Sequence, residues 1–396
     1  MNFHLKHALL SAACLSAALL AGCSSHSSPA LSSGRPEQQK IIKIGVFEPL
    51  TGENGSGGFH ETLGIRYANL AHPTVKIGED IYTVQLVEMD TKSDKSQAET
   101  VAQRLVNEKV SIVLGSYGSD VSIAAGKIFK EAEIPAIGAS FSNTNVTLDN
   151  DYYFRISFLD SFQGTALANY AIDHQYRTAA LISQTGSRYS AGLSTCFRDA
   201  FQHLGGMVLT EEYFVTGQTD FKDIMETIRD LDPDVIFASS SIAVAPLLLR
   251  QARDAGITAP IASGDRWENT AVIENSGGLA EGIIYSTCFD ESTPVSREAE
   301  TFITGFRAYL RDHKQPDMIP SVSALGYDAY LCAVRAIESA GTTDPKAIRN
   351  ALQNILIDGC TGPISFDQHG DARRNTAFIK TVKDGRFQYV TTTSAK

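Results

Sequence analysis

Short apolar runs alternate with amphipathic stretches along the first half of the chain, from residue 40 onward. β-Branched apolar runs predict strands, and apolar side chains at helical spacing predict helices. The predicted strands of this half span residues 41–47, 81–89, 110–114 and 134–137, and the helices between them span 59–70, 96–108 and 121–129. This alternation is typical of βαβ units, in which helices cover both faces of a parallel sheet.

The same rhythm starts again near residue 178, so a second α/β lobe of similar size is expected. Its predicted strands span residues 178–183, 207–213 and 235–238, and its helices span 190–203, 221–230 and 244–255. Longer helices follow at 297–313, 321–340 and 345–355, and residues 363–390 return to strands. A chain of this length is too long for one compact core. We therefore predict two α/β lobes that are completed by the C-terminal part of the chain.

Residues 1–22 have the features of a secretory signal. Lys6 and His7 precede the apolar run 8–20, and no acidic residue occurs before Cys23. This run is too short to span a membrane. Small residues directly before a cysteine are typical of bacterial lipoproteins, so we expect cleavage before Cys23 and lipid on its thiol. Residues 23–40 would then form a polar tether. The alternative is an ordinary signal peptide whose cleavage site happens to contain a cysteine.

The net charge and the cysteine spacing argue against two kinds of binding, to nucleic acid and to a metal. The formal net charge is −11, and removal of residues 1–22 takes away Lys6 and no acid, which gives −12. An acidic surface argues against nucleic acid as a partner. No apolar run after the signal reaches membrane-spanning length. The remaining cysteines show no metal-binding spacing and are either disulfide-bonded or small buried residues; they are Cys196, Cys288, Cys332 and Cys360.

Signatures of catalysis are largely missing from the sequence. It contains no GxSxG elbow, no GxxxxGK[ST] phosphate loop, no HExxH motif and no complete GxGxxG after the first strand. The histidines show no metal spacing. We therefore expect a protein that is not an enzyme and that uses neither a cofactor nor a metal.

In open parallel sheets, ligands bind at the carboxyl ends of the strands, so the loops there hold the candidate site residues. In the first lobe these loops are 115–120 and 138–143, which are rich in hydroxyl groups. Ser119 opens a predicted helix, where unpaired N–H groups and the helix dipole favour a bound carboxylate. The alternative is that Ser119 only caps this helix. The candidate ligand contacts of the first lobe are Tyr117, Ser119, Ser140, Phe141 and Ser142.

The second-lobe loops bring groups of a different kind. Asp265 can hold a ligand ammonium, and Trp267 and Tyr189 can cover an apolar ligand side chain. Arg188 or Arg266 can meet an acidic one. Each has a simpler alternative: a turn aspartate, a half-exposed packing aromatic, or a solvated arginine.

The segment IKIGVFEPLTG at residues 42–52 resembles the opening strand and loop of the leucine/isoleucine/valine-type, or branched-chain amino acid, periplasmic binding proteins. Four further stretches resemble this family in type and order. They are Asp90 before the helix at Ser96, Val113-Leu114-Gly115 through Ser119, LRQARDAG at 249–256 and GYDA at 326–329. TGPISFD at 361–367 with Gly370-Asp371 resembles the family's final crossing segment. The resemblance covers roughly residues 41–390.

This resemblance implies the type I periplasmic binding protein fold, with two Rossmann-like lobes joined by a hinge. Its three crossings are expected near residues 155–158, 285–287 and 362–365. The expected N-terminal lobe comprises residues 41–157 and 287–362, and the C-terminal lobe comprises 158–286 and 363–396.

The resemblance also implies roles for individual residues. Ser119, Ser140 and Ser142 match the family's carboxylate clamp, Tyr189 matches a tyrosine of the second lobe, and Asp265 matches the acid that binds the ligand ammonium. The sequence departs from the family around the pocket for the ligand side chain. Serines 239–241 stand where the family has a second-lobe aromatic residue, and the position of the family's first-loop aromatic falls near Gly57. The family's small first-lobe disulfide is missing. Leucine or valine specificity is therefore not implied.

We accordingly expect a monomeric solute-binding lipoprotein outside the cytoplasmic membrane. It would capture a small molecule, an amino acid above all, by hinge closure and deliver it to the permease and ATPase of an ABC importer. One alternative is the same fold binding an amide, urea or an aromatic acid. Another is a sensory or cell-wall-assembly lipoprotein with no role in transport, because a fold does not fix a function.

Overall fold

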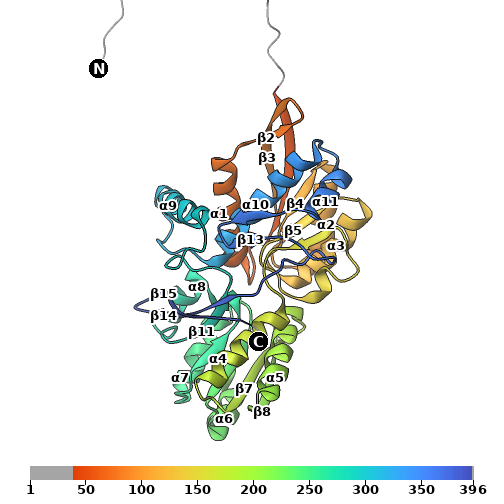
Figure 1. Ribbon diagram of the computed structural model, residues 1–396. Helices are drawn as coiled ribbons and strands as arrows, with labels where there is room; N and C mark the ends of the chain where they lie inside the picture. Colours follow the sequence, from red (N-terminus) through yellow and green to blue (C-terminus); the bar gives the residue numbers. More distant parts are fainter. Residues whose placement is uncertain (1–38, 395–396) are drawn as a thin grey trace, which may run out of the picture. The chain divides into compact units, whose positions relative to one another are not determined.

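The structure is a computed structural model, and it describes residues 39–394. The predicted signal, Cys23 and nearly all of the tether lie outside the described residues. The predicted α/β fold with two lobes is confirmed, since the described elements gather around two sheets (Figure 1).

The sheet of the first lobe has six strands in the order β2-β3-β1-β4-β5-β6. These are β1 (Lys40–Glu48), β2 (Thr74–Ile77), β3 (Asp80–Asp90), β4 (Ile112–Leu114), β5 (Ala136–Gly138) and β6 (Tyr153–Arg155). All neighbours are parallel except β2, which runs antiparallel to β3 at the edge. Strand β1 lies between β3 and β4, and it is buried at Ile42, Ile44 and Val46 on one face and at Gly45 and Phe47 on the other. This double-sided burial explains why β1 is mostly apolar, with Lys43 as an exception.

Helices from both ends of the chain pack on this first sheet. They are α1 (Gly55–Ala71), α2 (Lys95–Asn107), α3 (Ser119–Glu131), α9 (Arg297–Asp312), α10 (Ser321–Ala340) and α11 (Pro345–Leu352). Helix α10 runs beside α1, and a Cβ placed on Gly64 would lie 1.9 Å from the carbonyl oxygen of Ser323. Glycine is therefore required for this close helix contact. The C-terminal helices thus return to complete the first lobe, as the sequence predicts.

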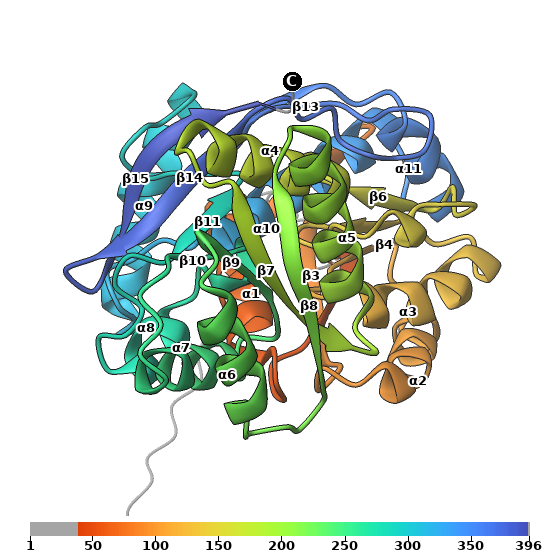
Figure 2. The same cartoon turned by 90° about the horizontal axis from the view of Figure 1, so that it is seen from below.

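The sheet of the second lobe has seven strands in the order β15-β14-β11-β10-β9-β7-β8 (Figure 2). These are β7 (Thr178–Thr185), β8 (Met207–Val215), β9 (Val235–Ser239), β10 (Ile261–Ser263), β11 (Ile284–Thr287), β14 (Ala377–Lys383) and β15 (Arg386–Thr393). Its helices are α4 (Asp160–Asp173), α5 (Arg188–His203), α6 (Lys222–Leu231), α7 (Ala245–Asp254) and α8 (Thr270–Ser276). The C-terminal hairpin β14–β15 adds two antiparallel strands at one edge.

The chain passes between the two sheets three times. The passages lie between β6 and α4, between β11 and α9, and between the short hairpin β12 (Ile357–Gly359)–β13 (Gly362–Ile364) and β14. The expected crossings near residues 155–158, 285–287 and 362–365 fall at or beside these passages. The numerical division into lobes remains a prediction.

A buried cluster of charges lies at the base of the second passage. Lys380 on β14 pairs with Glu268 and, at 3.2 Å, with Asp290, and all three side chains are almost inaccessible to solvent. Burial alone would lower the pKa of Lys380, but the charges of Glu268 and Asp290 outweigh it and raise this pKa. Glu268 also accepts a 2.7 Å hydrogen bond from the backbone N–H of Ser321 at the start of α10. The cluster therefore ties the second lobe to a helix of the first.

The four cysteines in residues 39–394 are free thiols, and three of them are buried. The alternative of small buried residues thus fits Cys288, Cys332 and Cys360. Within the same residues, no helix combines the length and the apolar character needed to cross a bilayer.

Candidate functional site

A cavity of about 450 Å³ lies between the loops at the carboxyl ends of the two sheets. Tyr117 and Gly118 line it from the first lobe, and Gln184, Ser187 and Arg266 line it from the second. Loop 115–120, which the sequence singled out, thus faces second-lobe loops across one space, whereas no residue of loop 138–143 lines it. Of the predicted contact residues, Tyr117 and Arg266 line this cavity, and the others lie outside its lining.

The two lobes touch beside this cavity. Ser56 donates a 2.8 Å hydrogen bond to Asn269, and the backbone N–H of Ala243 donates to the carbonyl of Glu53 at 3.3 Å. The backbone N–H of Arg188 donates to Asp120 at 3.1 Å. The structure therefore shows the lobes in contact, in a closed arrangement.

The three serines of the predicted carboxylate clamp are all buried, but their hydroxyl groups differ in their partners. Ser140 donates to Glu61, and Ser142 donates to Asp160 at 2.6 Å. A hydroxyl has one proton, so neither is free to donate to a ligand without changing partner. Ser119 accepts a long 3.4 Å bond from the backbone N–H of Asn143. Its proton remains available at the start of α3, directly after cavity residue Gly118.

Asp265 and Tyr189 are brought together in the second lobe. The Tyr189 hydroxyl donates a 2.9 Å hydrogen bond to Asp265, and both side chains are buried. Burial raises the pKa of Asp265, although the hydrogen bond from Tyr189 and the charge of Arg266 oppose this. A cation placed beside this carboxylate would therefore be strongly stabilised.

Tyr117 fills the space where the sequence lacks a first-loop aromatic. A Cβ on Gly57 would lie 2.4 Å from Cζ of the Tyr117 ring. Only glycine at 57 leaves room for this ring, so Tyr117 takes the place of an aromatic side chain on α1. The role of Tyr117 as a ligand contact remains a prediction.

Three other predicted residues turn their side chains to different surroundings. Trp267 is fully buried in the core of the second lobe and donates a 3.1 Å hydrogen bond to Ser240. Phe141 packs edge-on against Tyr153 with ring centroids 5.1 Å apart. The Arg188 side chain is exposed, and its backbone carbonyl accepts a 3.0 Å bond from Asn143. Their roles as ligand contacts remain predictions.

Sequence reasoning missed a pair of buried glutamates on the first-lobe side. Glu48 ends β1, Glu61 lies in α1, and both are completely buried. Burial and the charge of Glu61 raise the pKa of Glu48 well above its usual value, and burial also raises that of Glu61. The charge of Glu61 therefore opposes the ionisation of Glu48 in the same buried space. In the sequence, the signal for this pair was Glu48, an acidic residue at the end of a mostly apolar strand.

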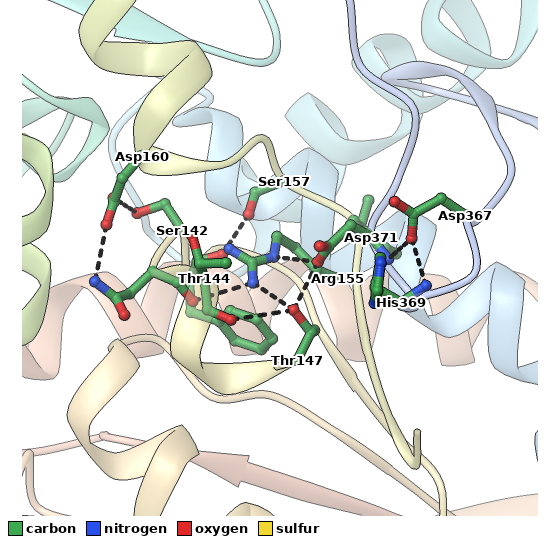
Figure 3. A network of polar contacts seen from close by, with 12 residues as sticks. Ser142, Thr144, Thr147, Arg155, Ser157, Asp160, Asp367, His369 and Asp371 are labelled. Carbon is green, nitrogen blue, oxygen red and sulfur yellow. Dashed lines mark hydrogen bonds and ion pairs between the residues drawn. The ribbon is translucent and has the colours of Figure 1, made fainter. Parts of the chain in front are cut away.

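A polar network joins the first passage between the lobes to the clamp loop (Figure 3). Arg155 is fully buried and donates to Asp371 at 2.9 Å, and it also donates to Thr147 at 2.9 Å. Asp160, at the start of α4, accepts the bond from Ser142 and a 3.0 Å bond from Asn143. The loop after β5 is thereby fixed to the first helix of the second lobe.

Asp160 gives this network a pH dependence. Burial raises its pKa to about 6, against a hydrogen bond from Ser142 and the charge of Arg155. An unfolded aspartate titrates near pH ~4. Between these values the folded state binds more protons, so this group makes the fold less stable as the pH rises. Relative to wild type, Asp160→Asn is expected to gain on the order of 3 kcal/mol of unfolding free energy between pH ~4 and ~7.

Urea unfolding of both proteins across this pH range measures the difference. Asp173, exposed at the other end of α4, supplies the control, since Asp173→Asn is expected to follow the wild type at every pH. A stability difference between Asp160→Asn and wild type that does not change with pH would contradict the assignment.

Comparison with known proteins places this architecture in a family. The sequence profile of the periplasmic binding proteins matches residues 41–386. The chain belongs to the periplasmic binding protein family. A leucine-, isoleucine-, valine-, threonine- and alanine-binding protein from Pseudomonas aeruginosa is 24% identical over 337 residues, which cover 84% of this chain and 87% of that protein.

Solved structures agree with this assignment. A leucine-binding protein from Thermotoga maritima superposes with a TM-score of 0.83 at 30% identity, covering 89% of this chain and 99% of that chain. A benzoate-bound solute-binding protein of an ABC transporter from R. palustris superposes with a TM-score of 0.78 at 20% identity, covering 89% and 96%. The predicted leucine/isoleucine/valine-type resemblance and type I fold are confirmed. This periplasmic binding protein is thus an extracytoplasmic solute-binding protein of the ABC transporter kind.

Proposed function

We propose that this periplasmic binding protein captures an α-amino acid by closure of its two lobes and hands it to the permease and ATPase of an ABC importer. The observation that carries the proposal is Asp265, a buried carboxylate directly before the cavity residue Arg266. Asp265 accepts a hydrogen bond from the hydroxyl of Tyr189. On the facing lobe, α3 begins with Ser119, directly after the cavity residue Gly118, and has no side-chain cap. The proposal thus pairs a negative group of one lobe with a helix end of the other lobe that favours anions.

In this mechanism the first lobe binds the ligand carboxylate and the second lobe adds the ammonium contact. Ser119 and the first-turn N–H groups of α3 receive the carboxylate. Closure then brings Asp265 and Tyr189 to the ammonium, and exclusion of water strengthens both contacts. The ligand selects the closed form because only that form offers contacts from both lobes. No chemical step is involved in this mechanism, in which the protein is a binding protein and not an enzyme. We propose that it acts as a monomer.

A benzoate-type aromatic acid is the second candidate. Tyr117 at the cavity and Tyr189, whose ring stacks on the cavity residue Arg266, favour an aromatic ring, and the relative from R. palustris was solved with benzoate. Such a ligand has no ammonium and would place its ring beside the buried charge of Asp265. This uncompensated carboxylate makes the amino acid the better candidate.

A thermal-shift screen tests the proposal. The unlipidated mature protein, refolded to remove bound ligand, is incubated with each amino acid, with amides and urea, and with benzoate-type acids. A ligand at about a hundred times its dissociation constant adds roughly 2.7 kcal/mol to stability, which raises the melting temperature measurably. A response to an α-amino acid supports the proposal. A response to aromatic acids or amides alone would contradict it.

We further propose that the protein is anchored in the cell envelope by lipid on Cys23. The proposal is supported by the secretory signal of residues 1–22, which ends directly before this cysteine. The wild type is expected to enter the detergent phase in Triton X-114 partitioning of expressing cells and to take up labelled palmitate, whereas Cys23→Ala is expected to take up none. A signal cleaved normally but without lipid would instead leave the wild type in the aqueous phase, and that result would contradict the anchor.

A further inference from the structure

Arg266 is a buried cation whose N–H donors have no acceptor among residues 39–394. Its residue is 7% exposed, and it lines the cavity between the lobes. Its guanidinium makes ring contacts with two tyrosines, but no hydrogen bond and no ion pair within 4.0 Å with the described residues. Asp265, the neighbouring residue, acts on it by charge without such a contact. Buried N–H donors without an acceptor are costly, so this group calls for a ligand.

Two tyrosines hold the guanidinium in place. It stacks on the ring of Tyr189 at 3.8 Å from the centroid, and the ring of Tyr117 lies 5.7 Å away. Tyr189 belongs to the second lobe and Tyr117 to the first, so closure completes this arrangement. Stacking leaves the edge of a guanidinium, which carries its N–H donors, free to bind a carboxylate in a bidentate manner.

The guanidinium also lies close to the positive end of a helix. A Cβ placed on Gly118 would be 3.7 Å from Nη2 of Arg266, and Gly118 directly precedes α3. The helix end and Arg266 therefore bring charge of the same sign together when the lobes close. An anion bound between them relieves this repulsion.

The charges of the site favour a ligand with two anionic groups. A neutral amino acid has one carboxylate for the end of α3 and one ammonium for Asp265, which leaves the N–H groups of Arg266 without an acceptor. An acidic side chain supplies that acceptor, together with a second negative charge. We infer that Arg266 selects amino acids with an acidic side chain, such as aspartate or glutamate, over neutral ones. This inference rests on the proposed function.

Calorimetric titration with two nearly isosteric pairs, glutamate against glutamine and aspartate against asparagine, tests the inference. Wild type is expected to bind the acidic member of at least one pair about 10- to 100-fold more tightly, as for a hydrogen-bonded charge pair. In Arg266→Gln this preference is expected to disappear. Arg250→Gln, which removes an exposed arginine on α7 of the same lobe, is the matched control and is expected to keep it.

Arg266→Lys provides a second variant in case Arg266→Gln does not fold. It keeps the charge but loses the planar fork, so the acidic preference is expected to shrink and not to vanish. Equal or tighter binding of glutamine, asparagine or leucine by wild type would overturn the inference, and so would an acidic preference that survives in Arg266→Gln.

Failure of this inference can be distinguished from failure of the proposed function. Tight binding of a neutral amino acid that is lost in Asp265→Asn would overturn the role of Arg266 and leave the proposed function standing. Binding of no amino acid at all would overturn both.

Discussion

Asp265→Asn is expected to raise the dissociation constant of the amino-acid ligand by at least about 30-fold. Truncating one partner of a buried charge pair costs about 2–5 kcal/mol, because the other charge stays buried and unpaired. Asparagine keeps the shape of the side chain, and its oxygen can still accept the hydrogen bond from Tyr189 that the carboxylate accepts at 2.9 Å. Isothermal titration of the variant and the wild type with the ligand found by thermal shift gives the ratio.

A matched control removes a carboxylate elsewhere in the same lobe. Asp220 is exposed, accepts a 3.0 Å hydrogen bond from the backbone N–H of Lys222 and is not part of the cavity lining. Asp220→Asn is expected to bind like the wild type. Unchanged affinity in Asp265→Asn would remove Asp265 from the binding site. Tighter binding of an aromatic acid by this variant would favour the benzoate-type candidate.

Lys380→Met is expected to lower the free energy of unfolding by about 3–5 kcal/mol, since it leaves two buried carboxylates with no cation. Glu268 and Asp290 both lose their ion pair in this variant. The side chain of methionine is close in volume, so the loss reports charge more than packing. Urea unfolding at neutral pH, followed by circular dichroism, measures it.

Lys222→Met is the control for this prediction, because Lys222 pairs with Glu226 at 3.7 Å on the surface of α6. Such an exposed helix pair contributes only about 0.3–0.5 kcal/mol. Adding Glu268→Gln to Lys380→Met removes one of the two unpaired buried carboxylates and is expected to restore part of the lost free energy of unfolding. Equal midpoints for Lys380→Met and the wild type would show that the cluster does not stabilise the fold.

Much of the fold could be predicted because its strands are buried on both faces. β1 and β9 read as apolar runs, and amphipathic helices such as α6 show their buried face in the sequence. Helix α4 was missed because its buried residues include Gln163, Gly164 and several alanines, so no apolar stripe marks it. The three-residue strands β6 and β10 are too short for any period to be visible.

The candidate site could be predicted only in part, since proximity between loops is a property of the folded chain. The sequence indicated Ser119 and Asp265 through a helix start and a family resemblance. It could not show that the Ser140 and Ser142 hydroxyls are already engaged by Glu61 and Asp160. Nor could it show Arg266 between two tyrosines of different lobes, because Tyr117 and Arg266 are separated by much of the chain.

The distance between the two lobes in solution tests the central claim, capture of an amino acid by closure, most directly. Lys95 and Thr216 line the cavity from opposite lobes, and Cys288, Cys332 and Cys360 are buried. Spin labels at Lys95→Cys and Thr216→Cys, in a mature chain with Cys196→Ser, report this distance by pulsed dipolar spectroscopy. The account predicts that one class of α-amino acid shortens and narrows the distance distribution. A distribution that stays the same with every amino acid, or that shortens only with aromatic acids or amides, would contradict it.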